Sequence, residues 1–181
     1  MFAGTALAAQ RFETPLGIMT AVADEEALYV LEFADRGDRP GDIDRLLART
    51  GRTVREGESG PIASIRRELS EYFQGSRTSF ETPIAAHGTE FERSVWRTLR
   101  EVPYGETRSY RDLAVELGRP TATRAVGRAN GANPLPIVVP CHRIIGSNGT
   151  LCGYGGQLWR KQWLLDHERR ASMAAGEGER N

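Results

Sequence analysis

The sequence predicts an α/β protein of two domains, an N-terminal α/β domain and a C-terminal, mainly α-helical domain. Two observations carry this prediction. Short strand patterns gather in the first half of the 181-residue chain, and three helix patterns with start and stop signals follow one another in the second half. The stretch from Ser76 to Gly88 joins the two halves. We expect domains at residues 1–82 and 83–171, followed by a disordered tail at 172–181.

The first half is typical of an antiparallel meander followed by two helices. The expected elements are strands at residues 10–13, 18–23 and 27–33, a loop at 37–41, and helices at 42–49 and 62–73. Pro61 stands at the start of the second helix and Gly75 beyond its end, which is the usual asymmetry of helix ends. No catalytic grouping of side chains stands out in this half, so we interpret it as a scaffold.

The helices of the second half are marked by their capping residues. Thr89 to Glu92 has the pattern of a capping box, in which the Thr89 hydroxyl accepts from the Glu92 backbone and Glu92 reaches back. Ser109 can cap a second helix, which ends at Gly118. A third helix is expected over residues 122–130.

A short helix, a tight turn and a second helix with small residues and arginines are typical of a helix-turn-helix. Small residues permit close approach either to DNA or to a neighbouring helix. Packing alone would favour larger apolar residues, so Arg124 and Arg128 among Ala and Gly favour DNA. Charge agrees with this reading, because residues 86–170 contain 13 Arg or Lys against 8 Asp or Glu although the whole chain is neutral. An ordinary solvated surface would give the same charge.

The sequence Pro140-Cys141-His142-Arg143 follows the apolar run at 136–139 and sets a thiol beside an imidazole at an expected strand end. A cysteine reacts as thiolate, and a neighbouring His or positive charge lowers its pKa from about 8.5. The motif therefore indicates an activated sulfur, without indicating its substrate.

Composition excludes several other classes of protein. Two cysteines cannot build a disulfide framework, and no paired Cys/His spacing offers a metal site. No run of about 18 apolar residues could span a membrane, and the first ten residues lack the basic start of a signal peptide. We expect a cytoplasmic protein without membrane, metal or cofactor.

Several segments of the second half together resemble the O6-alkylguanine-DNA alkyltransferases, also called methylated-DNA-protein-cysteine methyltransferases. The segments are Arg124-Ala125-Val126-Gly127, Asn133-Pro134, residues 137–145 around Cys141, Gly153-Tyr154-Gly155-Gly156, Trp163-Leu164-Leu165 and His167-Glu168. The resemblance covers nearly all of residues 89–170. The first half is similar to the family's variable domain only loosely, through the turn at 15–17 and its strands.

The resemblance implies a ribonuclease H-like first domain and direct-reversal repair of DNA. A monomer would transfer an alkyl group irreversibly from O6 of guanine, and from O4 of thymine, to Cys141. His142 would act as base through an ordered water, Glu168 would orient the imidazole, and Asn133 would be the hinge between the recognition helix and the active-site segment. Tyr110 would rotate the nucleotide out of the duplex and donate a proton to the leaving base.

The resemblance also implies a binding surface and a base pocket. Arg124 would fill the gap left by the extruded base, and a narrow helix face would enter the minor groove, with Ala122, Ala125, Ala129 and Arg128 along the helix. The carbonyls of Cys141 and Ile144 and the Gly155 backbone N–H would bind the base, between walls made by Pro136 and Tyr154. Cys152, His87 and His167 receive no role.

Two departures and three alternatives qualify this hypothesis. No cysteine precedes Cys141, so the zinc site of some family members should be absent, and Gly155 stands where some carry Ser. A binding-only relative lacks the acceptor cysteine that this chain has. A transcription regulator of this family would need a further cysteine cluster. A cysteine hydrolase would need an oxyanion hole, which the sequence does not reveal.

Overall fold

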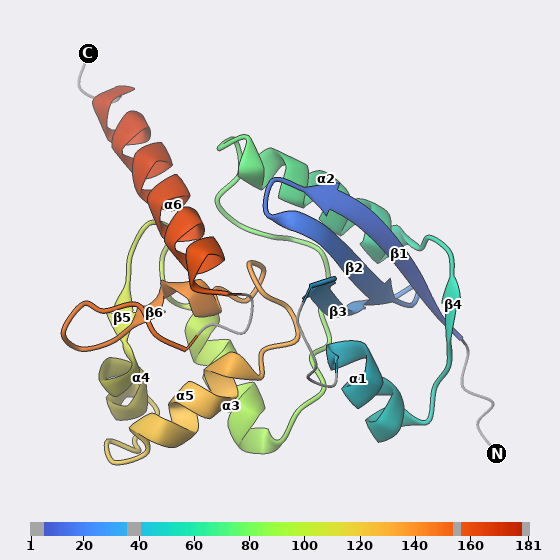
Figure 1. The fold of residues 1–181 in the computed structure, drawn as a ribbon, viewed down its shortest axis with the longest axis horizontal. Helices are drawn as coiled ribbons and strands as arrows, with labels where there is room; N and C mark the ends of the chain where they lie inside the picture. The colour runs from blue at the N-terminus through green and yellow to red at the C-terminus, as the bar shows by residue number, and fades with distance from the viewer. Residues whose placement is uncertain (1–5, 36–40, 154–156, 179–181) are drawn as a thin grey trace. The chain divides into compact units, whose positions relative to one another are not determined.

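The computed structural model describes residues 6–35, 41–153 and 157–178 (Figure 1). The chain divides into two compact units, residues 1–87 and 88–181. The boundary therefore lies a few residues beyond the expected one between 82 and 83. Most of the loop predicted at 37–41 lies outside the described residues.

The first unit is built on a mixed sheet of four strands with the order β3-β2-β1-β4. Its strands are β1 (Leu7–Thr14), β2 (Gly17–Ala23), β3 (Leu28–Phe33) and β4 (Val54–Glu56). The first three strands pair antiparallel, which confirms the predicted meander. The short, exposed β4 pairs parallel with β1 and was not predicted, because three polar-flanked residues carry no strand pattern.

The two helices of this unit lie on opposite faces of the sheet. From α1 (Asp42–Thr50), Leu46 packs in a cluster with Leu7 and Val22. From α2 (Gly60–Phe73), Arg66 Nη1 donates to Gln10 Oε1 over 2.9 Å. Leu7 and Gln10 stand an odd number of residues apart on β1, so their side chains project from opposite faces. The unit therefore has three layers.

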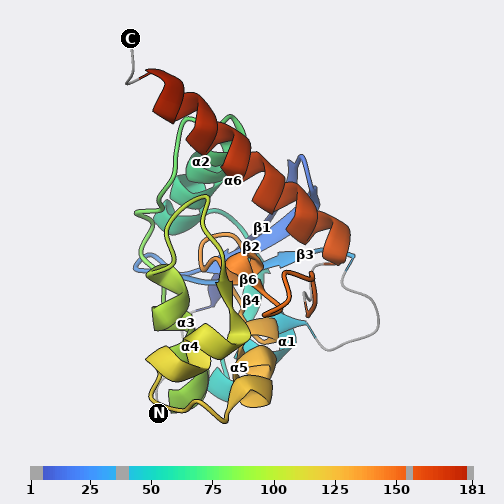
Figure 2. The same ribbon diagram turned by 90° about the vertical axis from the view of Figure 1, so that its left-hand side faces the viewer.

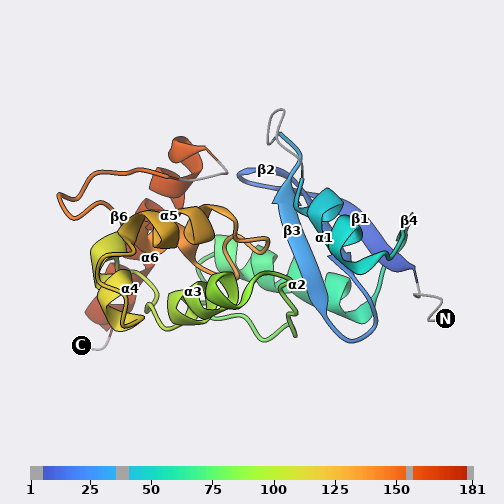
Figure 3. The same ribbon diagram turned by 90° about the horizontal axis from the view of Figure 1, so that it is seen from below.

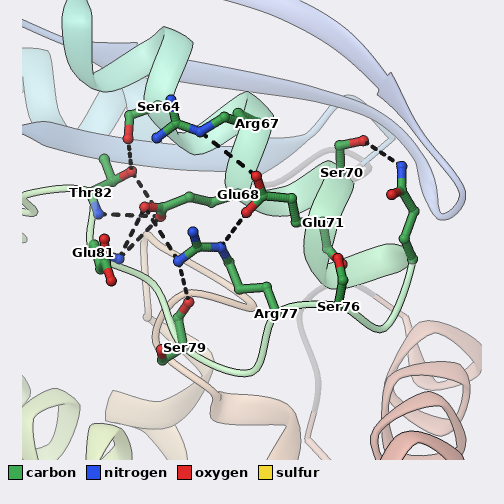
Figure 4. Close-up of polar contacts among 11 residues, drawn as sticks. Ser64, Arg67, Glu68, Ser70, Glu71, Ser76, Arg77, Ser79, Glu81 and Thr82 are labelled. Carbon is green, nitrogen blue, oxygen red and sulfur yellow. Dashed lines mark hydrogen bonds and ion pairs between the residues drawn. The ribbon is translucent and has the colours of Figure 1, made fainter.

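A buried carboxylate fixes the chain after α2 to that helix (Figure 4). Glu68 is only 1% exposed and accepts hydrogen bonds from the backbone N–H groups of Glu81 and Thr82, each over 3.2 Å. The Thr82 hydroxyl donates to the same carboxylate over 2.9 Å, and Arg77 lies 3.8 Å from it. The acceptors of Glu68 are thus filled by one neighbouring segment.

The second unit begins with three helices that pack on one another (Figure 3). They are α3 (Glu90–Arg100), α4 (Tyr110–Glu116) and α5 (Thr123–Gly131). Both predicted caps are confirmed, because Thr89 Oγ1 accepts from the Glu92 N–H and Ser109 Oγ accepts from the Asp112 N–H. Trp96 Nε1 on α3 donates to the Ala129 carbonyl on α5 over 2.8 Å, which joins the two helices.

Two very short strands and a long helix complete this unit (Figure 2). β5 (Arg108–Ser109) pairs parallel with β6 (Ile144–Ile145), and a single 3₁₀ turn, η1 (Cys141–Arg143), precedes β6. The helix α6 (Leu158–Gly178) continues into the segment 172–181, for which a disordered tail was expected. Ala and Met in this segment favour helix, and no proline interrupts them. None of the helices in the described ranges is long and apolar enough to cross a membrane.

Candidate active site

Cys141 does not stand at a strand end, so that prediction was wrong. The apolar run before it forms a tight turn, in which Ile137 has a positive φ of 75° and the Val139 N–H donates to the Leu135 carbonyl over 2.8 Å. Alternating β-branched residues would favour a strand, but a left-handed residue ends any strand ladder. The turn delivers Cys141 to the first position of η1, where it is 4% exposed.

Asn133 holds this turn in place from the end of α5. Its Nδ2 donates to the Val139 carbonyl over 2.8 Å, while its Oδ1 accepts from the Leu135 N–H over 3.0 Å. Both contacts are buried. The side chain thus connects the C-terminal end of α5 to the segment that carries Cys141, which is the position that the hinge hypothesis requires.

Glu168, on α6, lies at the centre of a fully buried ionic group. His142 Nε2 lies 2.8 Å from its Oε1, and Arg143 binds both carboxylate oxygens over 2.9 Å. The Gly105 N–H donates to Oε2 over 3.0 Å. Gly105 has a φ of 78° and so little space beside Ser172 of α6 that a side chain would collide with it. The geometry therefore requires glycine at this loop position.

The charges of this group fix the tautomer of His142. Burial opposes the ionisation of Glu168, but the hydrogen bonds and charges of His142 and Arg143 outweigh burial and hold its pKa far below the usual range. Burial lowers the pKa of His142, against the opposing effect of Glu168. A neutral imidazole facing an ionised carboxylate must place its hydrogen on Nε2. The other nitrogen, Nδ1, then has a free lone pair.

That second nitrogen is buried and has no hydrogen-bond partner among the described residues. His142 follows Cys141 directly in the chain. A base whose lone pair is free, held by an ionised carboxylate, can accept a proton from a thiol or from an intervening water. The arrangement can therefore activate one nucleophilic sulfur.

Tyr110 and Lys161 meet on the carbonyl of Cys152. The Tyr110 hydroxyl donates to it over 3.0 Å and Lys161 Nζ over 2.8 Å, and Lys161 also donates to the Ile144 carbonyl. Lys161 Nζ lies 5.7 Å from the centre of the Tyr110 ring. Burial raises the pKa of Tyr110, so its phenol keeps its proton at neutral pH.

The expected base pocket is described in part. Ile144 is fully buried and Pro136 is half-buried. The carbonyls of Cys141 and Ile144 both already accept a hydrogen bond from a protein side chain. Tyr154 and Gly155, the remaining members of the expected pocket, lie outside the described residues.

The predicted DNA-facing residues of α5 divide between two faces. Arg124 and Arg128 are exposed, and Ala122 and Ala125 are partly exposed, with Ala122 at the N-cap position. Ala129 departs from the expectation, because it is only 3% exposed. It belongs with Val126 and Asn130 to the stripe that packs inward, three and four residues apart. Ala129 therefore supports packing against α3.

Three residues of the site were not assigned from the sequence: Arg143, Gly105 and Lys161. Arg143 stands inside the quoted motif, and Lys161 is the only lysine of the chain, which could have drawn attention to both. Gly105 carried no sequence signal beyond a turn. Each acts through a partner tens of residues away or through the backbone, so local patterns do not reveal it.

Fold and site together define a class of protein: an α/β unit joined to a helical unit that carries a buried, activated cysteine. Two family models match the chain. The "6-O-methylguanine DNA methyltransferase, ribonuclease-like domain" matches residues 8–86, and the "6-O-methylguanine DNA methyltransferase, DNA binding domain" matches residues 90–170. The chain therefore belongs to the 6-O-methylguanine DNA methyltransferase family.

Individual relatives agree with this assignment over nearly their whole length. A methylated-DNA–protein-cysteine methyltransferase of Mycolicibacterium paratuberculosis is 45% identical over 163 residues, which covers 90% of this chain and 93% of that protein. The protein of the same name from Shigella flexneri is 44% identical and covers 88% and 94%. The crystal structure of Mycobacterium tuberculosis OGT in complex with DNA matches with a TM-score of 0.78 and 37% identity, covering 91% and 94%.

Proposed function

We propose that Cys141 is the acceptor in this chain's repair reaction and that His142 and Glu168 activate it. The protein carries out direct-reversal DNA repair by transferring an alkyl group to a cysteine. The observation that supports the assignment to these residues is the bare Nδ1 of His142. It is the base nitrogen that a thiol next to it needs, and Glu168 and Arg143 hold the ring in that tautomer.

The reaction balances without a metal or an added water. The Cys141 proton passes to His142 Nδ1 through an ordered water, and Glu168 stabilises the imidazolium. The thiolate attacks the alkyl carbon, a C–S bond forms, and the C–O bond to O6 of guanine or O4 of thymine breaks. Tyr110 donates a proton to the departing base. The product is a thioether that the protein cannot reverse, so each molecule reacts once.

Access to the alkylated base requires its extrusion from the duplex. We propose that α4 and α5 form a helix-turn-helix, that α5 enters the minor groove, and that Arg124 fills the vacated space. The exposure of Arg124 and Arg128 supports this placement, with Ala122 and Ala125 between them and the duplex. Asn133 then couples the position of α5 to that of Cys141.

The base pocket of this proposal uses backbone groups. The carbonyls of Cys141 and Ile144 and the N–H of Gly155 bind the base, and Pro136 and Tyr154 form the walls. The first unit serves as a ribonuclease H-like scaffold. The protein works as a monomer in the cytoplasm, where reducing conditions keep a reactive thiol available.

The test is a mass measurement. The protein is incubated with a duplex that contains one O6-methylguanine, and the peptide that carries Cys141 is expected to gain one methyl group while the DNA regains guanine. Cys141→Ser should gain none and leave the lesion in place. A Cys141 peptide without added mass, from protein shown to be folded and reduced, would reject the proposal.

A further inference from the structure

Asn130 has no role in the reaction as described so far, yet its side chain lies beside Cys141. It stands on the inner face of α5 and is only 1% exposed. Its Nδ2 donates to the Cys141 carbonyl over 3.3 Å. This contact sets the orientation of the amide, because the reverse orientation would bring Oδ1 against the carbonyl oxygen. The amide oxygen must therefore face away from Cys141 O.

The Oδ1 atom is buried and has no hydrogen-bond partner in the described part of the chain. Leaving a buried acceptor unpaired costs free energy, and such atoms at functional sites call for an explanation. The surroundings place this oxygen at the reactive centre. The Asn130 amide lies close enough to the Tyr110 hydroxyl to lower its pKa, against the larger effect of burial, and Gly127 one turn earlier lies against the Tyr110 ring.

Neighbouring acceptors differ from Oδ1 in one respect. The Cys141 carbonyl already accepts from Asn130, and the Ile144 carbonyl already accepts from Lys161. Each retains one lone pair for a ligand, whereas both lone pairs of Oδ1 are free. A ligand that brings a hydrogen-bond donor between Tyr110 and Cys141 would therefore find its least occupied acceptor at Asn130.

We propose that Asn130 Oδ1 accepts a hydrogen bond from the exocyclic amino group of the extruded base, so that Asn130 makes the site prefer guanine lesions to thymine lesions. The proposal rests on the function proposed above. In O6-alkylguanine, N1 carries no hydrogen, so the 2-amino group is the remaining donor on the pairing edge. O4-alkylthymine has no donor there and presents its O2 carbonyl instead. An amide oxygen attracts the first and repels the second.

The experiment compares single-turnover rate constants for three duplexes that differ only in the lesion: O6-methylguanine, O6-methylhypoxanthine, which lacks the 2-amino group, and O4-methylthymine. Wild-type protein is expected to react fastest with O6-methylguanine. Asn130→Leu, which has a similar shape without polar atoms, should narrow the ratio of the guanine to the hypoxanthine rate constant by about three- to tenfold, the value of one hydrogen bond. The ratio of guanine to thymine should narrow as well.

Ratios within one protein separate this role from a structural one. If Asn130 only supports Cys141 or Tyr110, Asn130→Leu will slow all three reactions equally and leave the ratios unchanged, which overturns the proposal. Asn130→Ala provides a second variant that favours helix, should the leucine fold poorly. Equal wild-type rate constants for guanine and hypoxanthine lesions would overturn the proposal without any variant. Absence of methyl transfer to Cys141 from every lesion would instead reject the proposed function itself.

Discussion

Each unit of the chain buries one glutamate completely, and the two glutamates differ in what satisfies them. In the first unit, Glu68 receives backbone N–H groups and one hydroxyl from the segment that follows its own helix. In the second unit, Glu168 receives an imidazole, a guanidinium and one backbone N–H. Backbone donors leave nothing over, so Glu68 fastens a segment. An imidazole donor has a second nitrogen, so satisfying Glu168 leaves His142 with an unused base.

The comparison teaches that burial of a charge does not by itself mark a reactive site. Both carboxylates are buried and hydrogen-bonded, as buried charges must be. Chemistry becomes possible only where the partner is itself titratable and keeps a free lone pair beside a nucleophile. The predictions that follow test this contrast, beginning with the largest expected effect.

Replacing each glutamate by glutamine should separate the two roles most clearly. Glu168→Gln removes the charge that stabilises the imidazolium and directs an amide N–H toward Arg143, so the rate constant of methyl transfer should fall by about 100-fold or more. Glu68→Gln should leave that rate constant unchanged and lower the free energy of unfolding by about 1–3 kcal/mol. Single-turnover kinetics and urea unfolding measure the two effects. Equal losses of rate in both variants would contradict the contrast.

Acid should act on the second unit through its buried pair. The pKa of His142 is lowered in the folded state, so the unfolded chain binds the proton more readily, and stability is lost as the pH falls below about 6.5, the unfolded value. The pKa of Glu168 is lowered too, which adds a loss below about 4.3. Urea unfolding between pH 7.5 and 5, conditions chosen on the order of these values, should show falling stability. His142→Asn should flatten this slope, and an unchanged slope would show that His142 is not its source.

The smallest expected effect concerns the first unit. Thr82→Val removes the hydroxyl that donates to Glu68 over 2.9 Å but keeps the backbone donors. The free energy of unfolding should fall by about 1 kcal/mol, the net value of a typical hydrogen bond. Methyl transfer should proceed at the wild-type rate. A slower transfer in this variant would mean that the segment after α2 influences the reaction, contrary to its purely structural role.

Local signals in the sequence predicted much of the fold. Thr89 and Ser109 cap their helices because the residues that satisfy them lie three positions away. The strand expected before Cys141 failed for the opposite reason. Val138 and Val139 favour extended structure, but Asn133 holds them in a turn that Ile137 enters with a positive φ. Such a bond competes successfully with intrinsic preference, and its partner cannot be read from a local pattern.

The same limit applies to the active site. Cys141, His142 and Glu168 were found through motifs, and the structure brings His142 and Glu168 together although 26 residues separate them. Arg143 was quoted without a role, because its value comes from two bonds to Glu168 on another helix. Asn130 was missed because an asparagine near a helix end is usually a stop signal. Only its burial and the unpaired oxygen set it apart.

The position of Lys161 has a practical consequence for chemical labelling. It is the only lysine in the sequence, and its fully buried Nζ binds two carbonyls beside Tyr110. Arginines supply the other basic side chains, and they do not react with amine-directed reagents. Acylation of residue 161 therefore requires this part of the second unit to open. The rate at which an amine-reactive probe modifies that position would report how often the reactive pocket opens, with no engineered label.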